Sequence, residues 1–97
     1  MSIQIIKKQI LPTLKRQGAI KVAIFGSFAI GKEKNTSDVD LLVNFKKDIL
    51  LMQLAAIKIK LEAKLERKVD LLTYGGINPH LKKIILRQQK IIYEKRQ

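Results

Sequence analysis

Apolar side chains recur every three or four residues in two long parts of the chain, as they do on the buried face of a helix. In residues 2–17 these positions are Ile3, Ile6, Ile10 and Leu14, and lysines lie between them. The pattern predicts an amphipathic helix that stops at Gly18. Pro12 interrupts it and predicts either a kink or the first turn of a new helix, because proline has no N–H to donate.

The clearest helical stripe covers residues 49–65. Its apolar positions are Leu50, Leu54, Ile57, Leu61 and Leu65. This spacing predicts a second amphipathic helix, with Asp48 as its N-cap because an aspartate accepts hydrogen bonds from free N–H groups. A last, shorter helix is predicted to open at Asn78-Pro79, because proline suits the first helical position. Its side chains at Leu81, Ile84 and Ile85 are expected to face inward.

Short apolar runs predict four strands. They cover residues 20–25, 37–43, 68–73 and 90–94. The order helix, strand, strand, helix, strand, helix, strand predicts an α/β fold, a small mixed β-sheet backed by helices on one face. We expect residues 1–97 to form a single domain, because a chain of this length holds one modest core.

Three of the four aspartates lie on predicted strands among apolar neighbours, where an unneutralised carboxylate is costly. Asp38 and Asp40 flank Val39, and side chains two residues apart on a strand point to the same face. Asp70 lies on the next strand. Adjacent like charges need a cation or a proton, and Mg²⁺ is a hard cation that prefers oxygen ligands. The sequence therefore predicts a magnesium site at the open face of the sheet.

A glycine-bounded loop separates the first two predicted strands. Gly26-Ser27 opens it, and such a turn lets backbone N–H groups and a hydroxyl approach phosphate closely. Residues 26–32 also fit the G-x-x-x-x-G-K pattern of a P-loop. A P-loop requires Ser or Thr next and a helix directly afterwards, whereas Glu33 and a polar loop follow here. This alternative also leaves the aspartate pair without a role. Tyr74, close to Asp70 in sequence, is a candidate for stacking on a nucleobase.

The composition adds a strong positive charge. Twenty lysines and arginines against eight aspartates and glutamates give a formal net charge of +12, which favours nucleotides, nucleic acid or an acidic protein surface. A lysine-rich composition is also typical of adaptation to heat. The chain has no cysteine, which excludes disulfides and thiolate metal sites. It also has no apolar stretch of about 18 residues, so we expect a soluble protein of the cytoplasm.

The spacing of Gly26-Ser27, ten residues and Asp38-Val39-Asp40 resembles the signature of the DNA polymerase β-like nucleotidyltransferases. That family carries a third carboxylate on a later strand, where Asp70 stands in this chain. At this length the chain is most similar to the minimal nucleotidyltransferases, small prokaryotic proteins often paired with a HEPN-domain protein. The resemblance covers nearly the whole chain and implies the bare catalytic palm of the superfamily.

The resemblance also implies a reaction and a partner. Its implied site residues are Asp38, Asp40 and Asp70, which would hold two Mg²⁺ ions, and Gly26, Ser27 and Lys32, which would bind the phosphates of ATP. AMP would pass to a tyrosine of a cognate HEPN toxin, and the silenced toxin would make this chain an antitoxin. A nucleic-acid acceptor is a less favoured alternative.

Position 30 departs from the family pattern. Many relatives read Gly-Ser-x-Ala-Arg-Gly in the loop, whereas this chain has Ile30 in place of the arginine. Lys32 or Lys34 could replace the lost cation, although lysine lacks the bidentate geometry with which arginine binds phosphate. A second hypothesis follows, in which the module is weakly active or inactive and neutralises its partner by binding alone.

Overall fold

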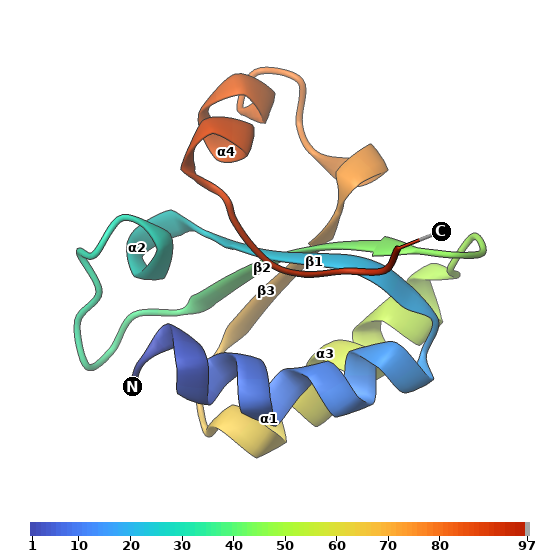
Figure 1. The fold of residues 1–97 in the computed structure, drawn as a ribbon, viewed down its shortest axis with the longest axis horizontal. Helices are drawn as coiled ribbons and strands as arrows, with labels where there is room; N and C mark the ends of the chain where they lie inside the picture. The colour runs from blue at the N-terminus through green and yellow to red at the C-terminus, as the bar shows by residue number, and fades with distance from the viewer. Residues whose placement is uncertain (97) are drawn as a thin grey trace.

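The computed structural model describes residues 1–96, and within them helices pack on both faces of a four-stranded sheet (Figure 1). The elements are α1 (Ile3–Arg16), β1 (Ala19–Phe25), the short α2 (Gly26–Ala29), β2 (Val39–Phe45), α3 (Leu51–Leu65), β3 (Val69–Thr73), a 3₁₀ turn (Tyr74–Gly76), α4 (Lys82–Gln88) and β4 (Lys90–Glu94). The predicted order of helices and strands is confirmed, and α2 is an addition to it. None of the helices in this part of the chain is long and apolar enough to cross a bilayer.

The sheet is mixed, as the sequence predicts. Its strand order is β3-β2-β1-β4, with β1 antiparallel to both β2 and β4. β2 and β3 run parallel, and α3 forms the crossover that a parallel pair requires. The predicted positions of Asp40 and Asp70 therefore lie on neighbouring strands, with β2 in the interior of the sheet and β3 at its edge.

The main core lies between the sheet and the layer formed by α1 and α3, drawn below the sheet in Figure 1. Ile6, Ile10 and Leu14 of α1, and Ile57, Leu61 and Leu65 of α3, are buried there against Val22, Ile24, Leu41 and Val43 of the strands. These are the positions that the helical and the alternating apolar patterns select. The two predicted stripes are therefore confirmed as core faces, except at Leu50, which precedes α3 and is 70% exposed.

Two predicted helix features are wrong in detail. α1 continues through Pro12, so the alternative of a new first turn is wrong. Pro12 is exposed, and solvent can satisfy the carbonyl that proline leaves without a donor. α3 begins at Leu51, and Asp48 does not cap it. The side-chain Oε1 of Gln53 instead accepts a hydrogen bond from the Leu50 N–H at 2.9 Å.

α4 packs on the opposite face from α1 and α3, above the sheet in Figure 1, so the expectation of helices on one face is wrong. It begins at Lys82 because the residues after Asn78 form a turn. The backbone carbonyl of Asn78 accepts a hydrogen bond from the Leu81 N–H at 2.9 Å, and the side-chain Oδ1 of Asn78 accepts one from the His80 N–H at 2.9 Å. Of the three side chains predicted to face inward, only Ile85 is buried, while Leu81 and Ile84 are about half exposed.

Candidate active site

The strand register brings two of the aspartates directly together. Asp40 on β2 is paired with Asp70 on the parallel strand β3 and with Phe25 on the antiparallel strand β1. Side chains paired across neighbouring strands stand on the same face of a sheet. The two carboxylates therefore lie side by side, next to the point where β1 ends and the Gly26-Ser27 turn begins.

Asp38 stands just outside the sheet, because β2 begins at Val39 and not at residue 37 as predicted. Val39 and Leu41 are buried against α1 and α3, whereas Leu42 faces α4, so Asp40 belongs to the α4 face. Asp40 is half-buried, while Asp38 and Asp70 are exposed. The carboxylates thus lie at the rim of the face that α4 partly covers.

The neighbouring carboxylates and partial burial act together on Asp40. Burial, the charge of Asp70 and the charge of Asp38, in that order, raise the pKa of Asp40 from 3.8 to about 6. Each of these causes disfavours the ionised form. Asp38 and Asp70 are therefore both close enough to Asp40 to disfavour its charge, and neutralising Asp40 with a proton or a cation relieves that repulsion.

The backbone of Gly26 packs directly on the carboxyl group of Asp40. A Cβ built on Gly26 would overlap Asp40 Oδ2 and lie 3.0 Å from its Cγ. Gly26 also has φ +70°, a conformation that side chains disfavour. Any larger residue would therefore displace the carboxylate, so the glycine of the motif is needed for close approach as well as for the turn.

After the turn, the chain forms α2 and then an exposed loop. The Lys32 N–H donates to the Ser27 carbonyl at 2.9 Å, while the Lys32 side chain is exposed. The P-loop alternative fails, because no helix continues from Lys32. The Ser37 hydroxyl accepts a hydrogen bond from the Lys34 N–H at 2.7 Å, which is a contact within the turn. Ile30, at the position of the family's arginine, is 46% exposed.

The donor set fits magnesium, although the groups do not converge in this structure. Among residues 1–96, no three carboxylates or imidazoles are close enough together to form a ready-made metal site. Carboxylate oxygens are nevertheless the ligands that Mg²⁺ prefers. Their mutual repulsion, seen in the raised pKa of Asp40, is the condition that a bound cation would remove.

Tyr74 lies outside this group of carboxylates, and Arg67 lies close to it. Tyr74 follows the far end of β3 from Asp70, and its hydroxyl donates to Gln89 Oε1 at 2.6 Å, while Lys21 Nζ lies 5.0 Å from its ring centroid. Tyr74 therefore has partners of its own in the fold, and its stacking on a nucleobase stays a prediction. One residue near the site was not expected from sequence: Arg67, whose guanidinium contacts the loop before Asp38. No periodic or motif signal marks it.

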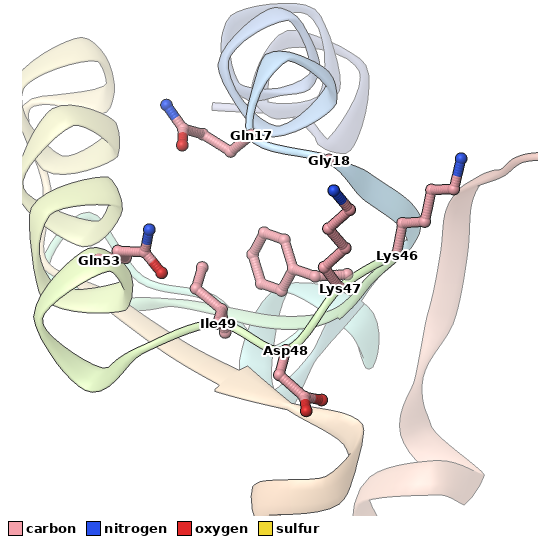
Figure 2. A pocket seen from close by; sticks show the side chains of 8 residues that line it. Gln17, Gly18, Lys46, Lys47, Asp48, Ile49 and Gln53 are labelled. Atoms are coloured by element: carbon pink, nitrogen blue, oxygen red, sulfur yellow. The ribbon is translucent and has the colours of Figure 1, made fainter.

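A hollow of about 300 Å³ lies at the opposite end of β2 from the aspartates (Figure 2). It is lined by Gln17, Gly18, Phe45, Lys46, Lys47, Asp48, Ile49 and Gln53. Figure 2 shows the carboxylate of Asp48 directed away from the hollow. Phe45 lies five residues after Asp40, about 17 Å along β2. The hollow is therefore not part of the carboxylate site.

Comparison with known proteins agrees with this geometry. Residues 8–97 match the family model described as "Polymerase beta, Nucleotidyltransferase". A Methanocaldococcus jannaschii protein named "Putative protein adenylyltransferase" is 43% identical over 88 residues, which cover 91% of this chain and 95% of that protein.

Solved structures share the fold. A crystal structure of a toxin–antitoxin with AMP-PNP superposes with a TM-score of 0.83 at 21% identity, covering 93% of this chain and 74% of that chain. The structure of a tri-AMPylated Shewanella oneidensis HEPN toxin in complex with MNT antitoxin contains a chain that superposes with a TM-score of 0.77 at 19% identity. This match covers 95% of this chain and 72% of that chain.

The raised pKa of Asp40 predicts a pH-dependent stability in the absence of divalent cations. Between pH 3.8 and about pH 6 the folded state binds more protons than the unfolded state, so the free energy of unfolding falls as the pH rises. Asp40→Asn should remove this contribution and be more stable than the wild type above pH 6, by about 1 kcal/mol after discounting for exposure. Urea denaturation across this pH range measures it, with the exposed Asp48→Asn as control. Equal pH slopes for wild type and Asp40→Asn would contradict the prediction.

The packing of Gly26 on Asp40 predicts that Gly26→Ala lowers the free energy of unfolding by more than backbone strain alone would. Gly31 provides a matched control, because its φ of +72° is nearly the same and nothing lies within 4 Å of its added Cβ. Gly31→Ala should cost about 1–2 kcal/mol, the penalty of the left-handed conformation. Gly26→Ala should cost more in denaturation experiments. Equal losses for the two variants would mean that Asp40 moves aside freely.

Proposed function

Because the chain belongs to the polymerase β nucleotidyltransferase family, we propose that it transfers AMP from ATP to a hydroxyl group of a partner protein. The observation that supports this most directly is the strand register. It places Asp40 beside Asp70, with the Gly26 backbone packed on the Asp40 carboxyl group. The turn that we propose to bind phosphate is thus in contact with Asp40, and Asp70 stands beside it, so metal-binding carboxylates and phosphate-binding groups come together as metal-assisted nucleotidyl transfer needs.

In this proposal the chain's own side chains bind and orient both substrates. Asp38 and Asp40, with Asp70, hold Mg²⁺, which when bound stabilises negative charge on the reacting phosphate and lowers the pKa of a bound hydroxyl. Gly26 and Ser27 start α2, where the first N–H groups of a helix have no acceptor within the helix. These N–H groups and the Ser27 hydroxyl bind the β- and γ-phosphates. The exposed Lys32 supplies a further positive charge.

The reaction is an in-line displacement at the α-phosphorus. The acceptor oxygen forms a bond to that phosphorus while the bond from the phosphorus to the bridging oxygen of pyrophosphate breaks. The proton of the acceptor hydroxyl passes to the exposed carboxylate of Asp70, which can return it to solvent. AMP remains on the acceptor, and pyrophosphate leaves.

The proposed acceptor is a tyrosine of a HEPN-domain toxin, and the proposed role is that of antitoxin. A structural relative is bound to a HEPN toxin that carries three AMP groups. The net charge of +12 favours an acidic partner surface through faster encounter. Ile30 supports a second candidate, a module that binds the toxin without transfer, because an exposed apolar side chain stands where many relatives carry arginine.

The metal-dependent part of the proposal predicts a thermal shift. ATP with Mg²⁺ should raise the melting temperature of the wild type more than ATP with EDTA, because a ligand that binds the native state stabilises it. Asp40→Asn should lose most of this difference while folding normally, and Asp48→Asn should keep it. The measurement is thermal denaturation by circular dichroism. Equal shifts with Mg²⁺ and with EDTA would argue against a metal-dependent site.

The reaction itself is tested by mixing the chain with a HEPN-domain protein from the same organism, labelled ATP and Mg²⁺. The partner should gain mass in units of AMP, on tyrosine by tandem mass spectrometry. Asp38→Asn and Asp70→Asn should each reduce transfer by about a hundredfold or more, since each removes a ligand of the charge-stabilising cation. Label on RNA alone would indicate an RNA-modifying transferase. Toxin inhibition without label would favour the binding-only candidate.

A further inference from the structure

Arg67 occupies the sharp turn between α3 and β3. Glu66 ends α3 in the left-handed conformation, with φ +53°, and so reverses the chain direction directly before Arg67. The Arg67 side chain is partly buried, unlike that of the next residue, Lys68, which is exposed. The turn therefore places one long cationic side chain against the protein rather than in solvent.

The guanidinium of Arg67 contacts both arms of the loop that leads from β1 to β2. Its Nη1 donates a hydrogen bond to the Ser37 carbonyl at 3.2 Å. Its central carbon lies 5.5 Å from the centroid of the Phe28 ring, within range of a cation–π interaction. Phe28 belongs to α2 and Ser37 immediately precedes Asp38. One side chain thus links the start of the loop to its end.

The two contacts differ in how firmly they are anchored. Phe28 is only 3% exposed and belongs to the main core, so it gives Arg67 a fixed platform. Residues 30–36 are all exposed. The Ser37 carbonyl accepts the Arg67 bond only two residues before Val39, whose N–H donates to the Lys68 carbonyl at 3.0 Å. Asp38 lies between these two tethers and is therefore held from both sides.

We propose that Arg67 is a positioning residue that clasps the end of the exposed loop against Phe28 and thereby fixes Asp38 beside Asp40 and Asp70. It acts through a carbonyl and an aromatic ring. Among residues 1–96, Lys21 and Glu94 form the one ion pair with an N–O distance within 4.0 Å. Arg67 therefore does not neutralise an aspartate directly. Its effect on transfer, which rests on the proposed function, comes from geometry rather than from charge.

The geometry also predicts which side chain can replace that of Arg67. A guanidinium can donate in its plane to a carbonyl while its face lies on an aromatic ring. Lysine keeps the charge and one donor but cannot satisfy both contacts in this way. Methionine keeps a long apolar side chain and loses the donor and the charge. Arg67→Lys should therefore retain part of the clasp and Arg67→Met none of it.

The test measures amide hydrogen exchange of the chain without nucleotide, by mass spectrometry. In Arg67→Met, exchange of residues 30–38 should rise about tenfold, the factor expected for one lost charge-assisted hydrogen bond. Exchange in α1 and β1 should stay unchanged. Arg67→Lys should show a smaller rise. Lys68→Met, the matched loss of a neighbouring but exposed charge, should behave as the wild type. Unchanged exchange of residues 30–38 in Arg67→Met would overturn the clasp.

Transfer kinetics separate the clasp from the proposed function. kcat should fall about tenfold in Arg67→Met and partly recover in Arg67→Lys, because misplacement of Asp38 weakens charge stabilisation. KM for ATP should change less, because the buried Phe28 still anchors α2. Faster exchange with unchanged kcat would overturn the positioning role. A wild type that transfers nothing would refute the proposed function, while hydrogen exchange would still decide whether Arg67 holds the loop.

Discussion

The constraint on which this molecule depends is the close placement of like charges at one end of a small sheet. Asp40 is half-buried between two strands, and this burial, together with the charges of Asp70 and Asp38, raises its pKa to about 6. Such a placement is costly, so the rest of the fold must hold it. β1 and β3 flank Asp40 in fixed register, the Gly26 backbone packs on its carboxyl group, and α1 and α3 anchor the opposite face of the same strands.

This arrangement brings the proposed carboxylates together with few structural elements. The carboxylates come from two strands and the segment before one of them, and the turn proposed to bind phosphate follows the end of a third strand. One sheet therefore positions all of these groups, while Lys32 lies on the exposed loop. The helical layer supplies the apolar area that a small core needs. Catalysis by positioning and charge stabilisation requires rigid placement of few groups rather than a deep enclosed cavity. The hollow in Figure 2, about 17 Å along β2 from Asp40, is accordingly separate from the chemistry.

Much of this was predictable from sequence, because burial imposes periods that the chain displays. The stripes of α1 and α3, the four strands and the spacing from Gly26 to Asp40 all follow from local pattern. The predictions from sequence fail where contacts in the folded structure, rather than the local pattern, determine the role of a residue. Asp48 has the chemistry of a cap, but the Gln53 side chain takes that role. α4 has an apolar pattern that does not say which face of the sheet it covers. Arg67 could not be recognised, because its partners are residues distant in sequence.

The position of β3 at an edge of the sheet has a consequence for how this molecule loses function. Asp70 stands on a five-residue strand that is bonded to β2 on one side only, whereas Asp40 lies on an interior strand. Edge elements open at lower free energy than the centre of a domain. Brief fraying of β3 would separate Asp70 from the aspartate pair while the remaining sheet stays folded. On warming, activity should therefore decline before the core melts, and a partner that covers this edge would act as a thermal stabiliser of the site.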